Sequence, residues 1–272
     1  MGGAHMLLNT EPLPCHPPSS AASARSHPLI ERLTRFVSLG PDECVAIEAL
    51  TRSRRTLLPG QSLVREGTRP ECVSLIMDGF AYRYRHWPDG RRQILGYLLP
   101  GDLCDTHFVV FDVCDHDIGT LCESRVANIP LTALMNTLVK FPKIERGLVM
   151  MSIVDAAISR EWLVNLGRRN AFEKLGHFFC ELAMRFHDTQ AYAQGREVDV
   201  PLTQVELADT MGLTVVHVNR VLQRFRRDGL LNWSRRHFHI LDFHRLATMS
   251  GFDPRYLHLQ QRVSEPRIGA YG

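Results

Sequence analysis

The sequence of 272 residues predicts an α+β protein with an N-terminal antiparallel β domain, one long central helix, and a C-terminal domain of paired helices. Three observations lead to this fold class. Short apolar runs alternate with turn dipeptides between Thr56 and Pro130. An uninterrupted amphipathic stretch fills Lys143–Leu166, and helix-capping residues flank a glycine at position 212. Period-two runs with turns predict strands, whereas a period of three to four predicts helices.

The composition is that of an ordinary soluble protein, with 44% hydrophobic and 22% charged residues and a net charge of +3. No apolar run approaches the roughly 18 residues of a membrane span, and no secretory signal is recognisable, so a cytoplasmic protein without membrane contact is expected. The seven cysteines include no C-x-x-C pair. In a reducing compartment most of them are expected to be small buried side chains.

The first domain is predicted to follow a disordered segment, residues 1–27, in which prolines and serines replace any periodic apolar face. Short helices are predicted over Pro28–Leu39 and Asp42–Leu50. The β region then forms an antiparallel roll, barrel or sandwich, and these parts together make a domain over 28–140. Its clearest hairpin joins Ala81–Trp87 to Arg91–Leu98 through a Pro-Asp-Gly turn.

The long central helix is predicted over residues 141–168. Apolar side chains recur along it at spacings of three and four, at Leu148, Met151, Val154, Ile158, Trp162 and Leu166. This face has two interpretations: it packs on its own domain, or it packs against a second copy as a short coiled coil. The second interpretation is favoured, so these six residues are predicted to form a homodimer interface.

The C-terminal domain, residues 169–250 before a tail over 251–272, contains the most informative pattern. Thr203 and Glu206 form a capping box that begins one helix. Gly212 stands where that helix must end in a sharp turn, and Thr214 caps a second helix that runs to about Arg227. A hairpin, or wing, is predicted from Trp233 to Ile240. This is the arrangement of a winged helix-turn-helix.

The second helix is amphipathic in a way that points to nucleic acid. Its outward side carries Val215, Val216, His217, Asn219, Arg220, Gln223 and Arg224. The wing tip carries Arg235 and Arg236, which are suited to phosphates. In a major groove, Arg can pair with guanine and Asn with adenine. The alternative, a three-helix core without any nucleic-acid role, leaves the glycine turn, both caps and the basic outer face unexplained.

At this point the chain resembles the Crp/Fnr family of bacterial transcription regulators, roughly from Pro28 to Met249. The motif Leu202-Thr203-Gln204-x-x-Leu207-Ala208, Gly212-Leu213-Thr214 and Asn219-Arg220-x-Leu222 carries the resemblance. It implies a cyclic-nucleotide-binding-like β-roll, a dimerisation helix and a winged helix-turn-helix. It also implies a homodimer on a palindromic promoter site, contact with RNA polymerase, guanine reading by Arg220, and phosphate contacts from Thr203 and Gln204. Val216 replaces the Glu that relatives usually carry, so their half-site sequence does not transfer.

The sensor half departs further from that family. Where relatives hold a cyclic phosphate with a Gly-Glu-Leu turn and a downstream Arg, this chain has Gly101-Asp102-Leu103 and the acids Asp105, Asp115 and Asp117. Control by cyclic AMP in the usual manner is therefore not expected, because these carboxylates repel an anion. An iron–sulfur cluster is not expected either, because Cys15 is the one cysteine near the N-terminus.

The first hypothesis is a DNA-binding regulator with a small-molecule, redox or absent effector, and two alternatives stay open. A metal or redox site is conceivable at Cys104, His107, Cys114, His116 and Cys122, although ordinary barrel residues are the favoured interpretation and no cofactor is predicted. A cyclic-nucleotide-fold adaptor or sensor module without DNA readout is the other alternative, which the basic recognition face disfavours. No G-x-S-x-G, P-loop, H-E-x-x-H or dinucleotide motif is present, so an enzyme is not expected.

Overall fold

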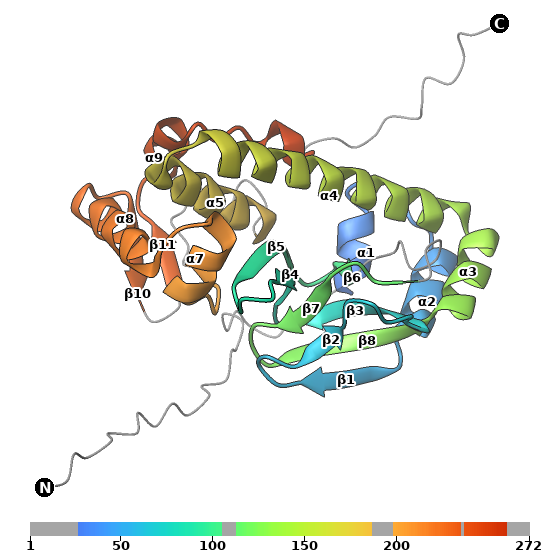
Figure 1. Cartoon of the computed structure of the whole chain (residues 1–272). Helices are drawn as coiled ribbons and strands as arrows, with labels where there is room; N and C mark the ends of the chain where they lie inside the picture. The colour runs from blue at the N-terminus through green and yellow to red at the C-terminus, as the bar shows by residue number, and fades with distance from the viewer. Residues whose placement is uncertain (1–26, 105–112, 187–197, 235–236, 260–272) are drawn as a thin grey trace, which may run out of the picture.

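The computed structural model describes residues 27–104, 113–186, 198–234 and 237–259. All of the predicted disordered segment except His27, and most of the predicted tail, lie outside these ranges. Figure 1 shows a β domain at one side, a helical domain at the other, and the long helix α4 running along both. The α+β fold class predicted from the sequence is confirmed.

The β domain consists of two four-stranded sheets in the described residues, with strand orders β1-β8-β3-β6 and β2-β7-β4-β5. Every strand pair is antiparallel, as the alternating runs and turns predicted. Ile76, Ile118 and Val126 are fully buried between the sheets. The strands are β1 Arg54–Leu57, β2 Ser62–Val64, β3 Cys72–Asp78, β4 Ala81–His86, β5 Arg92–Leu98, β6 Leu103–Cys104, β7 Asp117–Thr120 and β8 Ser124–Pro130.

Three short helices cover one end of this domain: α1 Pro28–Leu33, α2 Pro41–Leu50 and α3 Leu131–Lys140. The prediction of a helix to Leu39 was too long, because α1 ends at Leu33 and the chain continues in turns. Helix α3 was not predicted from the sequence. This helix begins directly after strand β8 with Pro130 at its N-cap and no side-chain capping bond, so it lacks the usual start signal.

The long helix α4, Pro142–Arg168, spans 27 residues, close to the predicted range. Its first half buries Leu148 against the core beside α1, and its second half buries Ile158 and Trp162 against the C-terminal domain. Half of the face expected to meet a second copy is thus packed within its own chain, while Met151, Val154 and Leu166 are half-buried. The exposed apolar side chains of α4 lie elsewhere, at Val149, Ile153, Leu163 and Val164.

The C-terminal domain surrounds an aromatic core in which Phe178, Phe179, Phe225 and Phe238 are almost fully buried. The helices α9 and η2, which the sequence reading did not predict, close this domain against α5 and α4. Its small sheet has the order β10-β11-β9. The elements are α5 Ala171–Phe186, β9 Val198–Asp199, α7 Gln204–Met211, α8 Val215–Arg227, β10 Leu231–Ser234, β11 His237–Ile240, α9 Phe243–Ser250 and the 3-10 helix η2 Pro254–Leu257.

Candidate nucleic-acid interface

The first helix of the motif, α7, begins with the predicted capping box. The Thr203 side-chain oxygen accepts from the Glu206 backbone N–H at 3.2 Å, and the Glu206 carboxylate accepts from the Thr203 N–H at 2.6 Å. The helix ends at Gly212, whose φ of 61° lies in the left-handed region that favours glycine. Both terminal signals are confirmed, and together they fix the angle at which the next helix leaves.

The second helix, α8, also forms as predicted. Thr214 caps it by accepting from the His217 backbone N–H at 3.2 Å. Val218, Val221, Leu222 and Phe225 form its buried side. The residues predicted to face outward are all exposed, namely Val215, Val216, His217, Asn219, Arg220, Gln223 and Arg224. Val216 is 69% exposed, which is unusual for a valine on a helix that already has a complete apolar face. An uncovered apolar side chain of this kind suits contact with a thymine methyl group.

The outward polar residues differ in how far they are already engaged. Within the described residues Arg220 forms no hydrogen bond or ion pair, so its guanidinium is free to bind. Asn219 donates to the Gln204 side chain at 3.3 Å, which ties α8 to the start of α7. Arg224 lies 4.3 Å from the Phe172 ring centroid and 3.4 Å from Asp228, so it is partly committed to the protein.

Two arginines near the wing bind the protein's own backbone, so not every basic side chain there is free for DNA. Arg226 donates to the Trp233 carbonyl at 2.8 Å, and Arg245 donates to the Asp228 carbonyl at 3.2 Å. Arg226 therefore holds strand β10 against α8, and Arg245 of α9 holds that helix against the turn that follows α8. Charge alone does not separate these structural roles from DNA binding. Arg235 and Arg236, predicted at the tip, lie outside the described residues, between β10 and β11.

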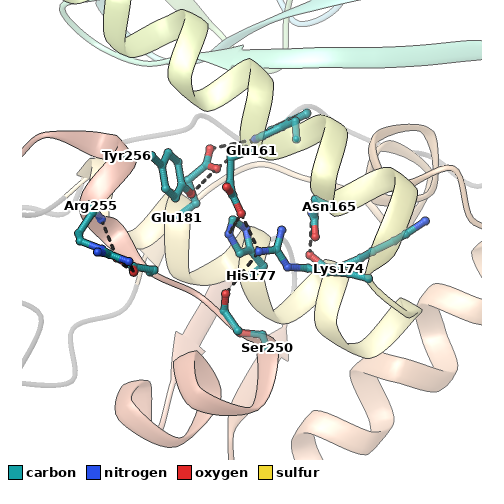
Figure 2. Close-up of polar contacts among 12 residues, drawn as sticks. Glu161, Asn165, Lys174, His177, Glu181, Ser250, Arg255 and Tyr256 are labelled. Atoms are coloured by element: carbon teal, nitrogen blue, oxygen red, sulfur yellow. Dashed lines mark hydrogen bonds and ion pairs between the residues drawn. The ribbon is translucent and has the colours of Figure 1, made fainter.

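A buried carboxylate joins α4 to the C-terminal domain, as Figure 2 shows. Glu181 of α5 accepts from Trp162 Nε1 of α4 at 3.1 Å and from the Tyr256 hydroxyl of η2 at 2.8 Å. Burial raises the pKa of Glu181, while Arg185, at 3.6 Å, opposes that shift. Three segments of the chain therefore share one acid.

A second cluster lies beside it. Arg169, between α4 and α5, donates to Glu161 at 2.6 Å and to the Gly251 carbonyl at 3.3 Å. The His177 ring is fully buried with Nε2 3.2 Å from the Glu161 carboxylate (Figure 2). Burial, together with the Arg169 charge, lowers the pKa of His177 to about 3. These contacts fasten the helix-turn-helix domain to the end of α4.

The sensor side of α4 borders a cavity of about 350 Å³. Its lining includes Asp115, as expected, and Asp102, whose carboxylate is bound by Arg32 and, at 3.3 Å, by Arg185. Arg83, which the sequence reading missed, also lines it, 3.6 Å from Asp155. Of the other predicted acids, Asp117 accepts from the Glu66 N–H and Asp105 lies outside the described residues. The cavity therefore has mixed charge rather than a purely acidic lining.

The cysteine–histidine cluster does not assemble into a metal site in the part of the chain that the structure describes. There, no three His, Cys, Asp or Glu side chains are placed to hold a metal ion. Cys104, Cys114 and Cys122 are buried, and His116 Nδ1 lies 2.7 Å from Asp115, while His107 and Cys15 fall outside the described ranges. No described helix is both long and apolar enough to span a bilayer.

Comparisons with known proteins agree with this geometry. Residues 173–249 match the Crp-like helix-turn-helix domain, and residues 54–140 match the cyclic nucleotide-binding domain. The transcriptional activator protein FnrL of Cereibacter sphaeroides is 31% identical over 210 residues, covering 73% of this chain and 81% of the relative. A probable transcriptional activator of Rhizobium leguminosarum is 29% identical, covering 72% and 80%. Among solved structures, FixK2 of Bradyrhizobium japonicum has a TM-score of 0.64 at 21% identity, covering 72% and 96%.

Proposed function

This chain belongs to the Crp/Fnr family of DNA-binding transcription regulators, and from that premise we propose that it binds a palindromic promoter site as a homodimer. Each subunit places α8 in one major groove, with the two half-sites about one helical turn apart. The observation that carries the proposal is the outward face of α8. On this face Arg220 forms no hydrogen bond or ion pair with any described residue, and its neighbours Asn219 and Val216 are exposed.

The roles of the individual side chains follow from their chemistry. Arg220 donates a bidentate pair to a guanine, and Val216 contacts a thymine methyl in place of the glutamate that relatives use on cytosine. His217, Asn219 and Gln223 complete the base contacts. The remaining predicted residues bind phosphates, which position the protein without reading sequence. They are Thr203, Gln204, Thr214, Val215 (through its backbone), Arg224, Arg235 and Arg236.

The dimer is assigned to the exposed side of α4 rather than to the face first expected. Val149, Ile153, Ala156 and Leu163 follow one another at spacings of four, three and seven, which fits the seam of a two-stranded coiled coil with Arg160 at the heptad position between the last two. Val149, Ile153 and Leu163 are 52%, 51% and 71% exposed in the single chain. Apolar side chains this exposed on one helix line indicate a second copy as the partner.

The first experiment is selection of bound DNA from a random duplex pool, followed by binding of Arg220→Ala to the selected site and to random duplex. The variant should lose about 1–3 kcal/mol per half-site on the selected DNA and much less on random DNA. Arg227→Ala is the matched control, because that side chain is exposed at the end of α8 beside Asp228. Equal losses on both duplexes would show that Arg220 binds phosphate only.

Sedimentation of Leu163→Asp tests the dimer. The change places a charge in the proposed seam and is expected to yield monomers, whereas Val139→Asp, on the exposed side of α3, should leave the dimer intact. A Leu163→Asp protein that sediments as the wild type does would locate the interface elsewhere.

Control by cyclic AMP is not part of this proposal. Asp102, in the turn where relatives carry a ligand-binding glutamate, is bound by two arginines, and Asp155 and Asp115 line the same cavity. Cyclic AMP at saturating concentration should therefore leave the affinity for the selected site unchanged. The expected further partner is RNA polymerase at the promoter. No cofactor and no catalytic role are proposed.

A further inference from the structure

The sensor domain holds the helix-turn-helix directly, through the hairpin that β4 and β5 form. Arg92 at the start of β5 donates to the Asp209 carboxylate of α7 through Nε at 2.9 Å, and its Nη2 lies 2.7 Å from the same oxygen. Its Nη1 donates to the Tyr82 hydroxyl at 3.0 Å. The two charged side chains are only 21% and 25% exposed, so water screens this pair incompletely. Residues 117 positions apart are joined.

A second set of contacts lies deeper. The Tyr97 and Thr210 hydroxyls are 2.6 Å apart, and both side chains are almost fully buried. Because the Thr210 hydroxyl donates to the Glu206 carbonyl at 2.6 Å, the Tyr97 hydroxyl must be the donor between them. Gln93 donates to the Thr210 carbonyl at 3.1 Å. Strand β5 thus satisfies a buried hydroxyl and a helix carbonyl of α7.

These contacts use a part of the motif that DNA does not need. Asp209 and Thr210 stand near the C-terminal end of α7, whereas the bases are read from α8, which remains exposed. In Figure 1, β5 lies beside α7 and α8 lies beyond it, at the end of the molecule remote from α2 and α3. The hairpin therefore does not compete with DNA, and it restrains the tilt of α7 and, through the Gly212 turn, the tilt of α8.

The β5–α7 contacts restrain the C-terminal domain, which is joined to α4 by a short connection between α4 and α5. Arg169, with an extended backbone conformation (ψ of 144°), ends α4 before α5 begins at Ala171. A rotation there would carry α7 away from β5. Arg185 near the end of α5 strengthens the same contact by donating to the Tyr97 carbonyl at 2.9 Å. The C-terminal domain is thus fixed both at the end of α4 and at β5.

We propose that Arg92 and Tyr97 of the sensor domain are positioning residues for DNA binding, which hold the two recognition helices of the dimer at the tilt that one DNA duplex requires. The inference rests on the proposed function. In the single chain, α8 lies beyond the end of α4 that is remote from α2 and α3 (Figure 1). A two-fold axis along the exposed seam of α4 would place both copies of α8 at that same end, where a single duplex can meet them. On this proposal, a change in the sensor domain that moves β5 would alter the affinity for DNA without changing a base contact.

The test measures affinity for the selected duplex by fluorescence anisotropy. Arg92→Glu replaces attraction to Asp209 by repulsion and should weaken binding about tenfold, whereas the base preference stays that of the wild type. Arg91→Glu is the matched control: it makes the same charge change one residue away, on a side chain that is 77% exposed and pairs only with Asp89 among the described residues. It should bind within about twofold of the wild type.

A charge swap separates positioning from simple loss of structure. Arg92→Glu combined with Asp209→Arg restores an opposite pair and should recover most of the affinity lost in the two single variants, measured as non-additivity in the cycle. Tyr97→Phe, which removes only the hydroxyl, should weaken binding about threefold to tenfold.

The possible results distinguish failure of the positioning role from failure of the proposed function. Arg92→Glu binding as the wild type does, or the Arg91 and Arg92 variants losing affinity equally, or no recovery in the swap, would overturn the positioning role while leaving the regulator intact. A wild-type protein that enriches no duplex would instead remove the proposed function on which the inference rests.

Discussion

The wild-type protein is expected to lose free energy of unfolding as the pH falls, because His177 is buried in its neutral form. Replacement of His177 by glutamine should remove most of that loss. The ring is fully buried between Phe252 and Tyr256, with centroid distances of 5.1 and 5.9 Å. The Glu161 carboxylate beside it is held by Arg169 at 2.6 Å, so its charge is largely compensated. The folded protein consequently keeps the imidazole neutral, and its pKa is lowered to about 3 from the ordinary value of 6.5.

The sign and size follow from proton linkage. Below pH 6.5 His177 becomes protonated in the unfolded chain, whereas in the folded chain it stays neutral until the pH approaches 3. Stability is therefore full above the unfolded pKa and is lost as the pH falls. Between pH 8 and pH 5 this one group removes about 2 kcal/mol from the free energy of unfolding, a value set mainly by the unfolded pKa.

The assay is urea unfolding at pH 8, 6.5 and 5, at one protein concentration, for the wild type and His177→Gln. The wild type should lose about 2 kcal/mol more than the variant over that interval. His244→Gln, which removes an exposed imidazole of α9, is the control and should follow the wild type. Parallel curves for wild type and His177→Gln would refute the reasoning, since they would mean that Glu161 keeps the buried ring protonated.

Three further expectations concern stability. Gly212→Ala should lower the free energy of unfolding by about 1 kcal/mol because of the φ of 61° alone, since an added Cβ meets nothing within 4 Å. Gly167→Ala, where the added Cβ is equally unobstructed but the backbone is helical, should not destabilise the protein. Calorimetry compares the two variants. Phe179→Ala, which empties the centre of the aromatic core, should cost about 3–5 kcal/mol in urea unfolding. Glu181→Gln should flatten the decline in stability as the pH rises above 4, because burial raises the pKa of that carboxyl and the folded state holds its proton longer than the unfolded one.

The sequence alone determined the DNA-reading unit. Three features depend only on groups within a few residues of one another, so the local sequence is enough to predict them. They are the capping box of Thr203 and Glu206, the left-handed turn at Gly212 and the outward side of α8. The same holds for the β4–β5 hairpin and for the extent of α4, whose period and turn residues are local signals.

Only the tertiary structure showed which side of α4 packs within its own chain and which side is left exposed. Periodicity marks a helix face as apolar but does not identify its partner, and α4 carries a buried line through Leu148 and Trp162 beside an exposed one through Val149 and Leu163. Likewise, no local pattern distinguishes Arg224, which contacts the Phe172 ring, from Arg220, which no described residue binds. The pairing of Arg92 with Asp209 spans 117 residues and depends on how two domains pack, because an ion pair arises from proximity in space, which separation along the chain does not specify.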